Sequence, residues 1–131
     1  MKKLMNKKGF TLMEMLIVVA IIVILVAVSI PTFTSSLDDA KKATDDANLR
    51  AAKAVANTMD MTDGWAALFT GAENAEAMDG ELYFDMDAGE FVSGTTNADK
   101  GQSDAYDDQY IIITIENGKM KTGPVWGTPA S

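Results

Sequence analysis

The sequence predicts an α+β fold, in which one long N-terminal helix packs on a small antiparallel sheet. Two observations predict it. An apolar run from Phe10 to Ile30 is followed by further helical spacing, and strand-forming segments occur only after Gly80. With 131 residues, the chain has room for one domain. We expect a basic leader at residues 1–9, a transmembrane helix at 10–31, an amphipathic helix half at 32–59 and a small globular region at 60–131.

The apolar run is long enough to cross a membrane. It comprises 21 residues with one charged side chain, Glu14. A helix of that length reaches about 32 Å. Four lysines lie within the first eight residues, whereas Asp38 and Asp39 follow the run. The positive-inside rule therefore predicts a cytoplasmic N-terminus and a globular part outside the membrane.

Helical spacing resumes after Pro31. Proline inside a helix bends the axis without necessarily ending it, so we expect a kink near Pro31. Charged residues spaced four apart predict the ion pairs Asp38–Lys42 and Asp46–Arg50. We expect the sheet to pack on the apolar, alanine-rich stripe of this helix half, whose members are Phe33, Leu37, Ala40, Ala43, Ala47, Ala51, Ala54, Val55 and Met59.

The C-terminal half predicts two hairpins. The first joins 82–84 to 91–92 across a turn at 87–89, and the second joins 110–115 to 119–122 across Asn117-Gly118, a strong type I′ turn signal. Before them, 65–69 and 72–78 predict short helical turns. Between them, 93–108 is rich in Gly, Asp, Ser and Thr and predicts an exposed, mobile loop.

Composition excludes several functions. The formal net charge is −8, and because four of the eleven basic residues lie in the leader, the remainder carries −12, which argues against a nucleic-acid surface. The absence of Cys and His removes disulfides, thiolate metal sites and the commonest general base, so we expect neither an enzyme nor a cofactor.

Acidic and aromatic residues could each form a binding site. Acidic residues of the loop could bind a hard cation, but they lack the spacing of an EF-hand and are weak candidates: Asp99, Asp104, Asp107 and Asp108. We expect most aromatic residues to lie in the core, with Trp126 as the exception because glycines and prolines surround it.

Glu14 is the feature that most needs a function. A carboxylate in a bilayer costs about 2.5 to 3.5 kcal/mol on insertion scales, so an intramembrane acid indicates a partner. If the chain is cut between Gly9 and Phe10, the new α-amino group of Phe10 lies about one helical turn from Glu14. The two could pair within one chain or between neighbouring chains. The alternatives are an accidental acid in a simple anchor and a secretory signal cleaved after Ser29.

The segment from Lys7 to Ile22, with the later Pro31, resembles the processing and assembly segment of type IV pilins and type II secretion pseudopilins. The resemblance implies that a prepilin peptidase and N-methyltransferase cuts after Gly9 and methylates Phe10. It also implies that Phe10, Glu14 and Pro31 serve subunit assembly. Val23 stands where many members have glycine, and both the cysteine pair and the calcium-loop pattern of some members are absent.

The function that this resemblance implies is a structural filament subunit. The chain would be held in membrane lipid until it polymerises with itself, through an inner-membrane platform with a cytoplasmic ATPase, into a cell-surface filament. One alternative is a pseudopilin of a secretion or DNA-uptake machine. Another is a monomeric, membrane-anchored or secreted binding domain.

Overall fold

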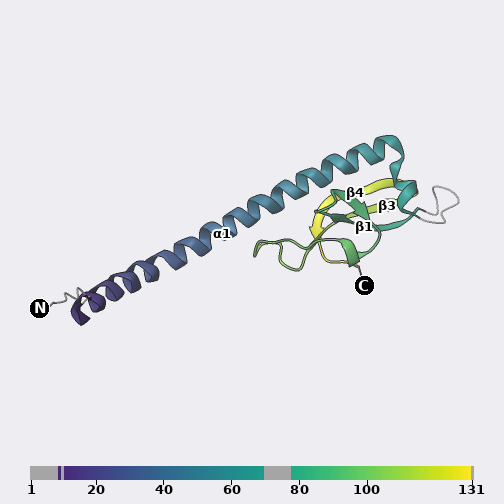
Figure 1. Cartoon of the computed structure of the whole chain (residues 1–131). Coiled ribbons are helices and arrows are strands. Elements are labelled where there is room, and N and C mark those ends of the chain that lie inside the picture. The colour runs from purple at the N-terminus through teal and green to yellow at the C-terminus, as the bar shows by residue number, and fades with distance from the viewer. Residues whose placement is uncertain (1–8, 10, 70–77, 131) are drawn as a thin grey trace, which may run out of the picture. The chain divides into compact units, whose positions relative to one another are not determined.

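The computed structural model describes residues 9, 11–69 and 78–130. The chain divides into two compact units, residues 1–37 and 38–131, and helix α1 (Leu12–Thr62) contributes to both (Figure 1). Every described residue of the first unit is exposed. The second unit contains the core and the sheet.

Helix α1 confirms the expected long N-terminal helix. Its apolar part includes an 18-residue window of mean hydropathy 3.0, none of it buried, which is long and apolar enough to cross a membrane. The helix continues through Pro31, and the kink expected there stays a prediction. It ends three residues beyond the expected position, where Asp63 takes a left-handed conformation with φ 53°.

A four-stranded antiparallel sheet has the order β2-β1-β3-β4 and confirms both predicted hairpins. Strands β1 (Gly80–Asp85) and β2 (Glu90–Val92) form the first, and β3 (Tyr110–Glu116) and β4 (Lys119–Gly127) form the second. The turn residues Asn117 and Gly118 have φ values of 54° and 71°, as a type I′ turn requires. The sheet therefore follows the turn chemistry of the sequence.

Strand β4 is longer than expected because an edge strand can include a proline. Pro124 lies in β4, where the pairing register with β3 shifts between Ile112 and Thr114. The bulge removes the need for a proline N–H in the ladder. The strand then continues to Gly127, which pairs with Tyr110.

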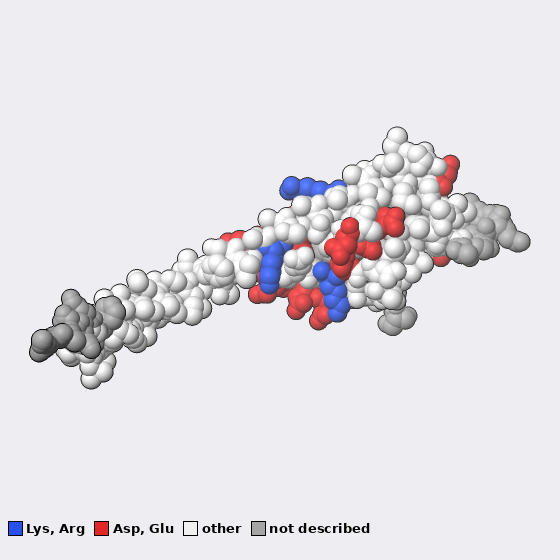
Figure 2. All heavy atoms as spheres, viewed as in Figure 1, with Lys and Arg blue, Asp and Glu red and all other residues white. Residues whose placement is uncertain are grey.

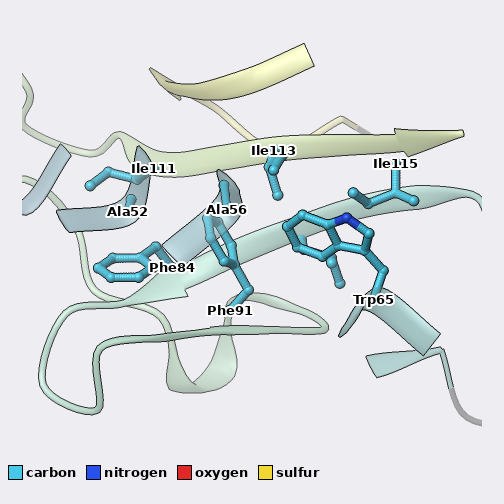
Figure 3. Packing of buried hydrophobic residues seen from close by; sticks show 9 residues of the cluster. Ala52, Ala56, Trp65, Phe84, Phe91, Ile111, Ile113 and Ile115 are labelled. Atoms are coloured by element: carbon cyan, nitrogen blue, oxygen red, sulfur yellow. The ribbon is translucent and has the colours of Figure 1, made fainter. Parts of the chain in front are cut away.

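The core lies between α1 and one face of the sheet (Figure 3). Phe91 from β2 meets Trp65 and Phe84 edge to face, with ring centroids 5.8 Å and 5.1 Å away. Trp65 comes from the short 3₁₀ helix η1 (Gly64–Leu68), which replaces the helical turn expected at 65–69. The buried cluster comprises Ala52, Ala56, Trp65, Leu82, Phe84, Phe91, Ile111, Ile113 and Ile115.

The expected packing stripe of the helix is wrong in its alanines, whereas Val55 and Met59, its last two members, pack against the core as expected. The helix faces the sheet with residues spaced three and four apart that start at a charged residue: Asp45, Leu49, Ala52, Ala56 and Met59. The alanines expected to face the sheet are exposed, namely Ala40, Ala43, Ala47, Ala51 and Ala54. Both stripes repeat at the helical period. The more apolar stripe does not face the sheet, because the other stripe contains Asp45, whose carboxylate accepts hydrogen bonds from the loop after β2.

That loop is attached to α1 through Asp45, which is 0% exposed. The Asp45 carboxylate accepts the backbone N–H groups of Gln102 at 3.0 Å and Ser103 at 2.8 Å, and the Ser103 hydroxyl at 2.7 Å. Nearby, the Asp104 N–H donates to Asp38 at 3.0 Å. Most of 93–108 is exposed as expected, but Gly101 and Ser103 are buried. These bonds argue against the mobility that composition predicted.

Side chains of the polar helix face also differ from expectation. Asp38 bonds the loop, and Asp46 pairs with Lys42 at 3.9 Å, so neither expected pair, Asp38–Lys42 nor Asp46–Arg50, forms within the described parts of the chain. Trp126 is partly buried against the core and stacks on Tyr106 at 4.7 Å, which corrects the expectation that it is the exposed aromatic residue. The helical turn expected at 72–78 falls almost wholly outside the described residues.

Candidate processing and assembly site

The start of α1 is built by a capping box, which the sequence shows as Thr11 followed three residues later by Glu14. The Thr11 N–H donates to Glu14 Oε2 at 2.9 Å, and the Glu14 N–H donates to the Thr11 hydroxyl at 3.1 Å. The first helical bond, from Met15 N–H to the Thr11 carbonyl, is 3.2 Å long. Thr11 is therefore the N-cap, and the helix begins one residue later.

Gly9 lies just before this cap, exposed and outside the helix. A peptidase must be able to reach the backbone that it cuts, and Gly9 is exposed. Phe10, on the other side of the expected cut, lies outside the described residues. The helix would thus begin two residues after the new terminus, so that cleavage leaves the cap intact.

Glu14 has hydrogen-bonding capacity left over. A carboxylate offers about four acceptor positions, and within the described residues Glu14 uses one, on Oε2. Its neighbours along α1 are apolar and exposed, among them Leu12, Met13 and Ile17. An exposed apolar helix that carries one partly satisfied acid is suited to a lipid or protein environment that supplies a cation.

Pro31 lies in a part of α1 where side-chain hydroxyls bond back to the helix. Ser29 donates to the Leu25 carbonyl at 2.7 Å, and Thr34 donates to the Ile30 carbonyl at 3.0 Å. Such bonds satisfy hydroxyl groups within the helix itself, which an apolar environment requires. The segment around the proline is therefore compatible with lipid despite its polar residues.

The weak metal candidates are not brought together as a site. Asp99 accepts the Met86 N–H at 2.9 Å, and Asp108 pairs with Lys100, which lowers the pKa of the Asp108 carboxyl. The carboxylates of Asp104 and Asp107 are exposed. Across the described ranges, no three acidic side chains form a group that could hold a metal ion.

Sequence reasoning missed two residues. Thr11 was identifiable from its spacing to Glu14, because Thr-x-x-Glu before an apolar run is the capping-box signal. Asp45 gave no such signal, since its donors come from a loop more than fifty residues later in the chain.

Comparison with known proteins agrees with this geometry. The family described as "Prokaryotic N-terminal methylation motif" matches residues 4–30. The chain is also 47% identical over 49 residues to the type IV narrow pilus major component PilA5 of Thermus thermophilus. That match spans 37% of this chain and 42% of the relative's length, less than half of either. No solved structure matches at a significant level. The chain thus carries a prokaryotic N-terminal methylation motif and is similar, over 49 residues, to a type IV pilus subunit.

Proposed function

We propose that this chain is the structural subunit of a type IV pilus-like filament, which polymerises through its apolar N-terminal helix after cleavage between Gly9 and Phe10. The observation that carries the proposal is the state of Glu14, an acid on an exposed apolar helix that accepts one hydrogen bond from the part of the chain that the structure describes and has further acceptor positions. The amine that cleavage creates at Phe10 is a cation of the right charge to occupy that capacity.

The pairing would act as a register. When apolar helices bundle, lateral contacts tolerate many axial offsets, because one apolar surface resembles another. An unpaired carboxylate in such a bundle is strongly disfavoured, so the offset that joins Glu14 to a neighbour's Phe10 amine is selected. The apolar surface would hold the helices together, and the charge pair would fix the axial displacement between neighbouring subunits.

Processing and transport partners follow from this proposal. A prepilin peptidase would cut after Gly9 and methylate Phe10, and lipid would hold the subunit until an inner-membrane platform with a cytoplasmic ATPase inserts it into the fibre. A pseudopilin in a secretion or DNA-uptake machine would share these steps. The relative named above is a pilus component, which favours the pilus.

The first test is the intact mass of the protein from its native host, measured separately in membranes and in sheared surface material. We expect a chain that begins at methylated Phe10 in both fractions. A mass that retains Met1, or one that begins at Ile30, would contradict the proposed cut. Gly9→Leu should leave the full-length chain in the membrane.

The second test is Glu14→Ala with Glu14→Gln beside it. Both should accumulate in the membrane as processed protein, and both should lose at least about tenfold in sheared filament protein, because neither presents a negative charge to the Phe10 amine. Normal filament yield from Glu14→Gln would show that hydrogen bonding suffices and would refute the charge register. Ser29→Ala, an uncharged change on the same helix, is the matched control and should polymerise normally.

A further inference from the structure

Charge is distributed unevenly within the second unit. Residues 38–59 of α1 contain four basic and four acidic residues, whereas residues 60–131 contain three basic and fourteen acidic ones, a net charge of −11. The helix is therefore the least acidic surface that the exported part of the chain presents.

Arg50 lies on the helix face opposite the sheet, and Lys53 lies beside it on the flank of the helix, about 100° from Ala52. Arg50 and Lys53 are exposed, and within the described parts of the chain neither takes part in a salt bridge or a side-chain hydrogen bond. At 100° per residue, Arg50 points about 160° away from the buried Ala52. Small exposed side chains surround it, at Ala43, Ala47 and Ala54, so that another surface can approach closely. We call these five residues the Arg50 face.

Four exposed acids that form no salt bridge among the described residues lie on or beside two loops of the same unit: Asp87, Asp104 and Asp107 are loop residues, and Glu90 is the first residue of β2. We call these the acidic loops. Hydrogen bonds place both loops beside the first turns of helix in this unit, since Asp104 N–H bonds Asp38 and the Asn48 amide contacts the Met86 sulfur at 2.9 Å. Figure 2 shows acidic side chains gathered on the sheet and loop side of the helix, and a basic side chain projecting from its other side.

We propose that the acidic loops of a second copy of this chain dock on the Arg50 face. The two surfaces have opposite charge and lie on different sides of the unit, so that one chain cannot pair them with itself. A contact between two different surfaces of identical subunits is heterologous, and such contacts propagate into open polymers. The inference rests on the proposed function, because a filament is what repeats this contact.

The positions of the two surfaces along the helix predict how far the second copy is displaced along the helix axis. Asp45, where the second loop is attached, precedes Arg50 and Lys53 by five and eight residues. A parallel copy displaced along the helix by about 7 to 12 Å brings its acidic loop level with those cations. The contact would also offset the mutual repulsion of units that each carry a large negative charge.

The test is a charge reversal with a compensating reversal, made in the full chain in its native host. Arg50→Glu with Lys53→Glu should lower sheared filament protein by about tenfold or more, because like charges then face each other. Adding Asp104→Lys with Asp107→Lys to that variant should restore filament protein to within about threefold of wild type. Processed protein in the membrane is measured beside it and should remain at wild-type amount in every variant.

Lys119→Glu with Lys121→Glu is the matched control. It changes the net charge equally, and it removes only the exposed pairs with Asp63 and Glu116, which contribute little to folding. An equal loss of filaments in this control would reduce the effect to overall charge and overturn the proposal. The proposal is also wrong if the reversal leaves filaments intact, or if the compensating reversal fails to restore them.

Two further outcomes separate this inference from other interpretations. If the wild-type chain forms no filament, the proposed function fails before the Arg50 face is tested. If Arg50→Glu with Lys53→Glu polymerises normally but purified filaments lose retention of double-stranded DNA, the cations serve a nucleic acid, and docking of a second copy is wrong.

Discussion

Glu14 and Asp45, two acidic residues of α1, differ in how their carboxylates are satisfied. Glu14 lies among exposed apolar residues and accepts one backbone N–H, from Thr11. Asp45 is completely buried and accepts two backbone N–H groups and a hydroxyl from the loop after β2. Among the described residues, the two carboxylates differ in how much of their bonding capacity their own chain fills.

The difference separates folding from assembly. Asp45 is nearly saturated, so its bonds hold the second unit together. Asp60 behaves similarly, because the Met120 N–H at 2.9 Å and the Trp65 indole N–H at 3.2 Å lower the pKa of its carboxyl. Among the described residues Glu14 accepts a single hydrogen bond, which leaves capacity for a partner on a neighbouring chain.

Asp45→Ala should have the largest effect on stability and tests whether the saturated acid belongs to folding. It leaves the Gln102 and Ser103 N–H groups without an acceptor, so we expect a loss of about 3 kcal/mol or more. Unfolding of the full chain in detergent, followed by fluorescence of Trp65 and Trp126, measures it. Asp46→Ala is the control and should lose less than about 0.5 kcal/mol, because it breaks one pair at 3.9 Å. Equal losses would contradict the special role of Asp45.

Tyr83 adds a third case to the comparison, because its hydroxyl donates a hydrogen bond to the carboxylate of Glu81. Burial, together with the bond from the Tyr83 hydroxyl to Glu81 at 2.9 Å, raises the pKa of Tyr83 to about 12. Since the pKa in the unfolded chain is lower, near 10, stability should fall as pH rises from about 10 to 12 and should not respond to this group below that window. Alkaline unfolding of wild type against Tyr83→Phe isolates the effect. An identical pH dependence in both proteins would refute it.

Gly101→Ala perturbs the loop that supplies the donors to Asp45. An added Cβ would lie 2.5 Å from the Tyr106 Cβ and from its carbonyl oxygen, so the backbone must move. We expect a loss of about 1 to 3 kcal/mol. Gly123→Ala, where an added Cβ meets nothing within 4 Å, is the matched control. Filament protein should fall at least as far as the folded subunit does, because the same loop carries Asp104 and Asp107 of the proposed contact. Equal stability of the Gly101→Ala and Gly123→Ala variants would contradict the close packing of Gly101 on Tyr106.

Thr11→Val should have the smallest effect, and it tests the Glu14 half of the comparison between Glu14 and Asp45. It removes the hydroxyl that caps the Glu14 N–H, at a cost of about 1 kcal/mol in helix stability, whereas Thr11→Ser keeps the cap. Amide exchange of residues 14–16 in detergent micelles should quicken in the valine variant only. If both variants exchange alike, the capping box does not hold the start of α1.

Much of the fold could be predicted because its signals are local. The apolar run identifies a helix long and apolar enough to cross a membrane, Asn117-Gly118 identifies a hairpin, and Thr11 with Glu14 marks a helix start. The packing face of α1 could not be predicted in this way. An alanine stripe and the stripe through Asp45 have the same period, and only the position of the loop donors distinguishes them.

The sequence by itself determined the fold class, the apolar helix and the position of the acid within it, since these depend on composition and short spacings. The tertiary structure alone decided that Asp45 is buried, that the alanine stripe faces outward and that Arg50 lies opposite the sheet. The physical reason is that a buried charge is tolerated only where donors converge on it, and those donors come from residues distant in the chain.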